Sequence, residues 1–279
     1  MARLSEDLYQ KPTRFIMELI QNADDNRYAP DLVPTLHLTY ANRYLRVDCN
    51  ELGFTRENVE AICSIGRSSK PKSAFAGQYI GEKGIGFKAV FKVADVVWIS
   101  SGDYSFKFDK RERLGMIAPI WDKLPGEKRA GWTSLYIQLE KSYSPDDMVS
   151  ELKCLDPRLL IFLRRLRTID ITIAGPGKEV WTRSLRRREN DLNFDGIQAI
   201  QLMQNSDYIN YIITRHKISG LREERKRPGI SDSEAMLAFP IAASWQPVAQ
   251  NQHVFAYLPV RDYGFKVRAR LGVPAGACC

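Results

Sequence analysis

The chain has 279 residues with 44% hydrophobic and 10% aromatic side chains, five cysteines and a formal net charge of +8 at pH 7. This composition predicts a globular chain with a full apolar core, and it lacks the run of about 18 apolar residues that a membrane-spanning helix requires. The cysteines include no Cys-x-x-Cys pair, so neither a disulfide framework nor a structural zinc site is indicated. We therefore expect an intracellular protein of the cytoplasm or nucleus, without a membrane partner.

The first predicted elements are a helix and a hairpin. The helix covers residues 6–25, because Pro30 and Pro34 in the following segment cannot continue it. Apolar and polar residues then alternate over 35–40 and over 44–49, which is typical of two antiparallel strands with one buried face. A sheet is therefore expected to begin directly after the first helix.

The middle of the chain contains further helices and strands. A helix is predicted over 56–63, and another over the apolar segment 87–95, which follows a polar stretch and a glycine cluster. Apolar and β-branched runs predict strands at 96–101, 104–109, 132–140, 168–175 and 179–185. This mixture predicts an α+β fold, a sandwich with helices on one face of the sheet.

Three polar side chains recur at helical spacing inside the apolar first helix. Glu18, Asn22 and Asp25 lie within ELIQNADD, and Glu18 and Asn22 share one helix face. Magnesium prefers oxygen ligands and keeps several waters while it holds substrate phosphates, so the Asn22 amide oxygen is a candidate metal ligand. Glu18 would then orient or deprotonate a water near the terminal phosphate. The alternative is an exposed polar stripe, with only the neighbouring apolar stripe packed.

A glycine cluster before the second predicted helix is a candidate phosphate site. The backbone N–H groups of Gly81, Gly84 and Gly86 can approach an anion closely, and a helix N-terminus adds a favourable dipole. Glycine turns before helices are also common structural punctuation. The order Gly-x-x-Gly-x-Gly, followed by Phe87, fits neither a P-loop nor a dinucleotide fingerprint. A phosphate site here would therefore belong to a class of phosphate-binding loop other than these two.

Four segments in order, ELIQNADD, NELGF, IGEKGIGFKAVF and GWTSLYIQL, resemble the ATP-site boxes of the GHKL or Bergerat-fold ATPases. This superfamily includes gyrases, sensor histidine kinases and the large heat-shock chaperones. Within it, the chain most resembles ATPase-like regions of the sacsin and NO VEIN-like type, over residues 4–140. The resemblance implies a two-layer Bergerat-type α+β sandwich that binds ATP with magnesium, with a mixed, mostly antiparallel sheet and helices on one face.

The resemblance also implies a role for each matched residue. Glu18 matches the water-activating base and Asn22 the magnesium ligand, while residues 66–79 match the lid that closes over ATP. The further matches are expected to bind the nucleotide, and they are Asp25, Asn50, Glu51, Gly53, Gly81, Gly84, Gly86, Phe87 and Thr133. The family pattern Asp-x-Gly-x-Gly is replaced by DCNELG, so Glu51 is the first candidate acid for adenine and Asp48 the alternative.

The second half of the chain carries a weaker pattern. Residues 1–190 are predicted to form the ATP-binding domain, and residues 191–279 a linker and the start of a second, incomplete domain. Basic clusters at 164–167, 186–188 and 222–227 are typical of solvated helix faces, although the net charge would also attract a polyanion.

Three functions remain open from the sequence. The first is an ATP-binding, slowly hydrolysing switch whose lid closure alters a chaperone-like or regulatory protein client, with a homodimer as a family expectation. The second is a nucleotide-binding module without turnover. The third is a basic nucleic-acid-binding protein, which a steep salt dependence of binding would reveal. Even within the family, Gly53 has an alternative interpretation as a turn residue and Thr133 as an ordinary strand residue.

Overall fold

The computed structural model describes residues 14–63, 86–175, 177, 179–194, 197–220, 232–242, 246, 248, 251–256 and 258–266. Two of the predicted phosphate-binding residues, Gly81 and Gly84, lie outside these ranges, and so does the predicted lid at 66–79.

The chain divides into two units. The first comprises Met1–Asp156 and Leu163–Leu185, and the second comprises Pro157–Phe162 and Arg186–Cys279. The domain boundary predicted at residue 190 stays a prediction.

Helices are few and short among the described residues. They are α2 (Arg14–Asp25), α3 (Arg56–Cys63), the 3-10 helix η1 (Gly86–Lys92), α4 (Pro145–Lys153) and α5 (Leu159–Phe162). α2 forms the described part of the first predicted helix and packs beside η1. Its apolar side chains are buried, and they are Phe15, Ile16, Leu19 and Ile20. None of the helices in the described ranges has the length and apolarity needed to cross a membrane.

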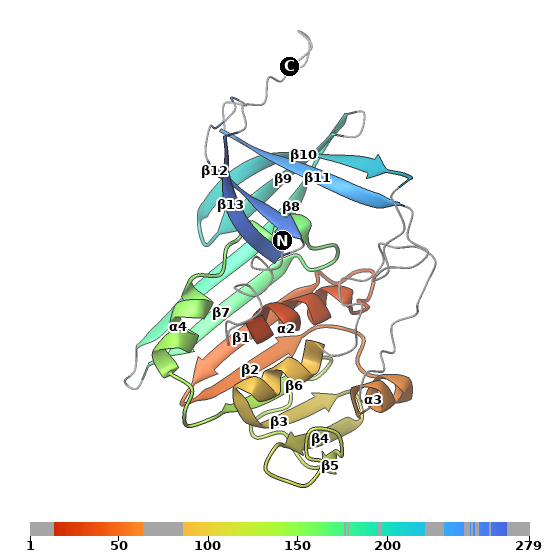
Figure 1. The fold of residues 1–279 in the computed structure, drawn as a ribbon, viewed down its shortest axis with the longest axis vertical. Coiled ribbons are helices and arrows are strands. Elements are labelled where there is room, and N and C mark those ends of the chain that lie inside the picture. Colours follow the sequence, from red (N-terminus) through yellow and green to blue (C-terminus); the bar gives the residue numbers. More distant parts are fainter. Residues whose placement is uncertain are drawn as a thin grey trace. The chain divides into compact units, whose positions relative to one another are not determined.

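Seven described strands lie wholly in the first unit, in the order β7-β1-β2-β6-β3-β4-β5 (Figure 1). They are β1 (Thr35–Ala41), β2 (Tyr44–Cys49), β3 (Ala94–Ser101), β4 (Tyr104–Asp109), β5 (Ile120–Trp121), β6 (Thr133–Leu139) and β7 (Thr168–Ala174). β1 pairs with β7 in parallel, and the other neighbours pair antiparallel. The hairpin predicted over 35–49 is therefore confirmed.

Side chains of this sheet alternate between its two faces. Every second residue of β1 is buried, as the sequence pattern predicted. The register of β2 against β6 pairs Asp48 with Ser134 and Cys49 with Thr133. Because successive side chains of a strand point to opposite faces, Asp48 and Ser134 share one face while Thr133 lies on the other. The polar residues at the end of β2 and the start of β6 therefore lie on two different faces of the sheet.

The remaining strands belong mostly to the second unit. They are β8 (Val180–Phe194), β9 (Ile197–Gln204), β10 (Asp207–Ile218), β11 (Ser233–Ile241), β12 (Asn251–Ala256) and β13 (Leu258–Lys266). β10 pairs antiparallel with both β9 and β11, and β12 pairs with β13 in a separate two-stranded sheet.

The predicted two-layer Bergerat-type α+β sandwich is wrong. Backbone ladders connect eleven strands in the order β11-β10-β9-β8-β7-β1-β2-β6-β3-β4-β5, and the described helices are too few and short to form a layer over such a sheet.

One misread segment and a region with weak strand patterns contribute to this difference. The segment 87–95, predicted as a helix, contains only the short η1, and β3 begins at Ala94 because the β-branched and aromatic run VVWIS favours a strand. Beyond residue 190, the described ranges contain long strands, and the many polar side chains of these strands conceal their alternation.

Candidate functional site

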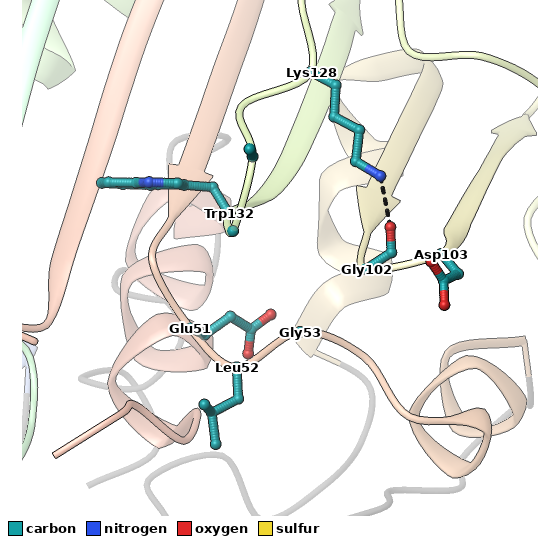
Figure 2. A pocket seen from close by; sticks show the side chains of 9 residues that line it. Glu51, Leu52, Gly53, Gly102, Asp103, Lys128 and Trp132 are labelled. Carbon is teal, nitrogen blue, oxygen red and sulfur yellow. Dashed lines mark hydrogen bonds between the residues drawn. The ribbon is translucent and has the colours of Figure 1, made fainter.

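A pocket of about 360 Å³ lies where β2 and β3 end and β6 begins (Figure 2). Its walls come from the loop after β2, the turn between β3 and β4, and the loop before β6. The lining residues are Glu51, Leu52, Gly53, Gly102, Asp103, Lys128, Ala130, Gly131 and Trp132. Lys128 connects two of these walls, because its Nζ donates to the Gly102 carbonyl oxygen over 2.6 Å. Two predicted site residues, Glu51 and Gly53, thus line one pocket.

Glu51 is the buried acid of this pocket. The residue is 8% exposed, and no described group offers a hydrogen bond to its Oε1 atom. Burial raises the pKa of the Glu51 carboxyl to about 7, and the nearby Thr133 hydroxyl offsets this only in part. Figure 2 shows the carboxyl group extending from the loop after β2 toward the side of Gly53. A buried acceptor without a partner costs about 1–3 kcal/mol, and a ligand that supplies a donor would remove this cost.

Thr133 is connected to the same pocket through a hydroxyl pair. The residue begins β6 and is 2% exposed. Its Oγ1 lies 2.6 Å from the Oγ of Ser101 at the end of β3, and Ser101 Oγ accepts a hydrogen bond of 2.8 Å from the Phe54 backbone N–H. The structure therefore brings the predicted residues Glu51 and Thr133 together and adds Ser101, which the sequence analysis missed.

Asp48, the alternative acid for adenine, has different surroundings. Its carboxylate accepts hydrogen bonds from Arg46 Nε at 2.9 and 3.0 Å and from Ser134 Oγ at 2.6 Å. The residue is 5% exposed and is not among the residues that line the pocket. Its oxygen atoms are thus already engaged in the folded chain.

Asn50 connects two strands instead of lining the pocket. Its Oδ1 accepts from the Thr35 backbone N–H over 2.7 Å, and its Nδ2 donates to the Val33 carbonyl oxygen over 2.9 Å. These bonds hold the start of β1 beside the end of β2. Gly53 lies in the wall with a φ of +91°, a conformation that favours glycine, so the residue supports the turn that carries Glu51.

The polar residues of α2 do not line the described pocket. Glu18 and Asn22 are half-buried, and Asp25 is buried at the end of the helix. The loop after α2 nevertheless reaches the pocket wall, because the Leu52 backbone N–H donates to the Arg27 carbonyl oxygen over 2.9 Å. The roles of these α2 side chains as base, metal ligand and nucleotide contact stay predictions.

The predicted phosphate loop is described only at its end. Gly86 begins η1, and Phe87 packs against Phe91 and Phe108 with ring centroids 6.1 Å away in each case. Phe87 therefore contributes to an aromatic cluster of the first unit. In the described ranges, no group of three or more His, Cys, Asp or Glu side chains is arranged to hold a metal ion.

Asp24 is a buried acid that the sequence analysis overlooked beside Asp25. It is 0% exposed, and its carboxylate accepts three backbone hydrogen bonds of 2.8–2.9 Å from Arg164, Arg165 and Leu166. The bonds tie the end of α2 to the segment before β7. No local pattern signals this role, because its partners follow about 140 positions later in the chain.

Nearly the whole chain is similar to one part of a plant protein. It is 32% identical, over an alignment of 287 residues, to Protein NO VEIN of Arabidopsis thaliana. The chain is NO VEIN-like. The NO VEIN alignment covers 94% of this chain but only 10% of the plant protein, so the chain spans about one tenth of that relative's length. No protein-family model matches the chain.

Proposed function

We propose that this NO VEIN-like chain is a GHKL-type ATP-binding domain that acts as a slowly hydrolysing switch. The observation that carries the proposal is the buried Oε1 atom of Glu51, an acceptor without a described partner in the wall of a pocket. The ordered boxes ELIQNADD, NELGF, IGEKGIGFKAVF and GWTSLYIQL support the same assignment.

The chemistry of Glu51 suits the exocyclic amine of adenine. An ionised carboxylate only accepts hydrogen bonds, so it would bind the amino group of adenine and repel the exocyclic carbonyl oxygen that guanine carries at the same position. A pocket of about 360 Å³ lies within the ordinary range for small-molecule sites. Glu51 is therefore the proposed adenine-reading residue, with the Thr133 hydroxyl nearby.

The phosphate end of the nucleotide is assigned from the sequence boxes. Asn22 would supply one amide oxygen to a magnesium ion that also holds the phosphates, and Glu18 would orient the attacking water. The half-buried positions of both side chains on α2 are compatible with these tasks. A closing lid, a homodimer and a protein client belong to the same proposal.

The first test is calorimetric titration of MgATP into the whole chain at pH 8, where Glu51 is mostly ionised. Glu51→Ala should weaken binding by roughly 10- to 100-fold, the value of a hydrogen bond to a charged group. Asp103→Asn is the matched control, because Asp103 lines the same pocket but is exposed, and its affinity should stay within about threefold. Equal binding by wild type and Glu51→Ala would contradict the proposal, as would a wild type that does not bind.

Binding without turnover is the second candidate. It is favoured by one observation, namely that Glu18 and Asn22 are not among the residues lining the pocket that contains Glu51. Phosphate release separates the two functions. The switch predicts slow release by wild type and none by Glu18→Ala, which still binds MgATP, whereas a module without turnover releases no phosphate in either protein.

A further inference from the structure

Residues 128–132 form one wall of the pocket that contains Glu51, and this wall has contacts on two sides. On one side, Lys128 Nζ donates to the Gly102 carbonyl oxygen at 2.6 Å. Figure 2 shows the ring of Trp132 extending in the other direction, away from Gly102. The second side of the wall is therefore held by whatever the Trp132 ring contacts.

The Trp132 ring contacts two side chains that are not among the residues lining the pocket. The guanidinium carbon of Arg129 lies over the ring, 4.3 Å from its centroid, and the ring centroid of His37 lies 4.8 Å from that of Trp132. Arg129 and His37 also contact each other, with 2.6 Å between Nη1 and Nδ1. The three side chains thus connect the loop before β6 to β1.

The direction of the hydrogen bonds follows from the donors available. A guanidinium only donates, so His37 Nδ1 is the acceptor toward Arg129. The imidazole then carries its proton on Nε2, which lies 3.2 Å from Asp170 Oδ2. Asp170 pairs with His37 in the register of β7 and β1, and its Oδ1 accepts from Ser184 Oγ at 2.6 Å. The orientation of the ring that receives Arg129 is therefore fixed from the neighbouring strands.

We propose that Arg129 is a positioning residue of the pocket. Its contacts with His37 and Trp132 hold the wall at 128–132 against β1, while Lys128 holds the same wall on its other side. Both anchors act on one short turn, in which the Trp132 backbone N–H donates to the Arg129 carbonyl oxygen at 3.2 Å. The effect on ligand affinity rests on the proposed nucleotide binding, whereas the effect on the wall holds for the chain without ligand.

The first test measures the wall without ligand, through hydrogen exchange at the backbone amides of residues 128–132. Arg129→Ala should raise the exchange rate there by roughly threefold, the value of a cation–π contact at an exposed site. Arg129→Lys keeps a charge for the ring and a donor for His37, so it should return the rate toward wild type. Arg56→Ala is the matched control, because Arg56 is also exposed but pairs with Glu60 on α3, and the rate should stay unchanged.

A second measurement tests the contact between Arg129 and His37 itself. 15N NMR of the His37 ring at pH 8 should show the proton on Nε2, because Nδ1 accepts from Arg129. In a double-mutant cycle, His37→Ala and Arg129→Ala should each speed exchange, and the double variant should exchange more slowly than the product of the two effects predicts. A ring that carries its proton on Nδ1 would overturn the proposal, and so would independent effects in the cycle or unchanged exchange in Arg129→Ala.

Calorimetry with MgATP separates this inference from the proposed function. Arg129→Ala should weaken MgATP binding by roughly threefold to tenfold, although Arg129 is not among the residues lining the pocket. If wild type does not bind MgATP but Arg129→Ala speeds exchange, nucleotide binding fails and the positioning role of Arg129 stands. If wild type binds MgATP and the affinity of Arg129→Ala is unchanged, only the role of Arg129 fails.

Discussion

Asp48 and Glu51 are two buried acids at the same end of β2. Their surroundings differ in the cation and in the hydrogen-bond donors that lie beside each carboxylate. Asp48 lies beside the Arg46 guanidinium and the Ser134 hydroxyl on one face of the sheet. Glu51 lies in the pocket wall near the Thr133 hydroxyl, and no described group offers a hydrogen bond to its Oε1 atom.

This difference teaches how to separate a structural acid from a binding acid. A buried carboxylate with a cation and a hydroxyl beside it has its charge compensated within the folded chain, so its removal leaves the cation without a partner and destabilises the chain. A buried carboxylate without a cation destabilises its own charged form, which is why the pKa of Glu51 is raised to about 7. An uncompensated acceptor next to a pocket is an indication of a ligand.

The largest expected effect concerns the pH dependence of folding. Because the Glu51 pKa of about 7 in the folded chain exceeds the ordinary value of 4.5, the stability linked to this group is complete below about pH 4.5 and is lost as the pH rises through 7. Glu51→Gln removes this loss. Between pH 4 and pH 8, the free energy of unfolding of wild type should therefore fall by about 3 kcal/mol relative to that of Glu51→Gln. Urea unfolding at both pH values measures the gain.

The control for that comparison is Glu60→Gln. Glu60 pairs with Arg56 on the exposed surface of α3, so its replacement should leave the pH dependence of wild type within about 0.5 kcal/mol. Parallel pH profiles for wild type and Glu51→Gln would show that the Glu51 carboxyl is ionised at the same pH in the folded and unfolded chain, and the comparison with Asp48 would then fail.

A somewhat smaller effect is expected at Asp48. Asp48→Ala leaves the Arg46 guanidinium, which is 21% exposed, without its carboxylate, and should lower the free energy of unfolding by about 2 kcal/mol. Glu60→Ala is the control on the exposed pair with Arg56 and should cost less than about 1 kcal/mol. If Asp48→Ala instead abolished MgATP binding at unchanged stability, Asp48 would be the adenine-reading acid.

The sequence predicted most strands of the first unit, but not the order in which they pair. Alternation identified the hairpin of β1 and β2 and most other strands, because a strand with one buried face repeats every two residues. It did not reveal an eleven-stranded sheet, since strand order depends on pairings between distant segments such as β1 with β7.

The sequence predicted part of the candidate site, but not the contacts that depend on distant segments of the chain. The motif NELGF singled out Glu51 and Gly53, which line one pocket, but the sequence left the choice between Glu51 and Asp48 open. Their different partners come from β6, where adjacent Thr133 and Ser134 point to opposite faces. Lys128 was missed because its contact with Gly102 forms only after the chain has folded.

The most direct test of the account is to titrate the Glu51 carboxyl by 13C NMR with and without saturating MgATP. If the adenine amine donates to Glu51, bound nucleotide stabilises the ionised carboxylate, and the midpoint should fall clearly below the value of about 7 in the free chain. A midpoint that stays the same or rises while MgATP is bound would contradict the claim that Glu51 reads the nucleotide.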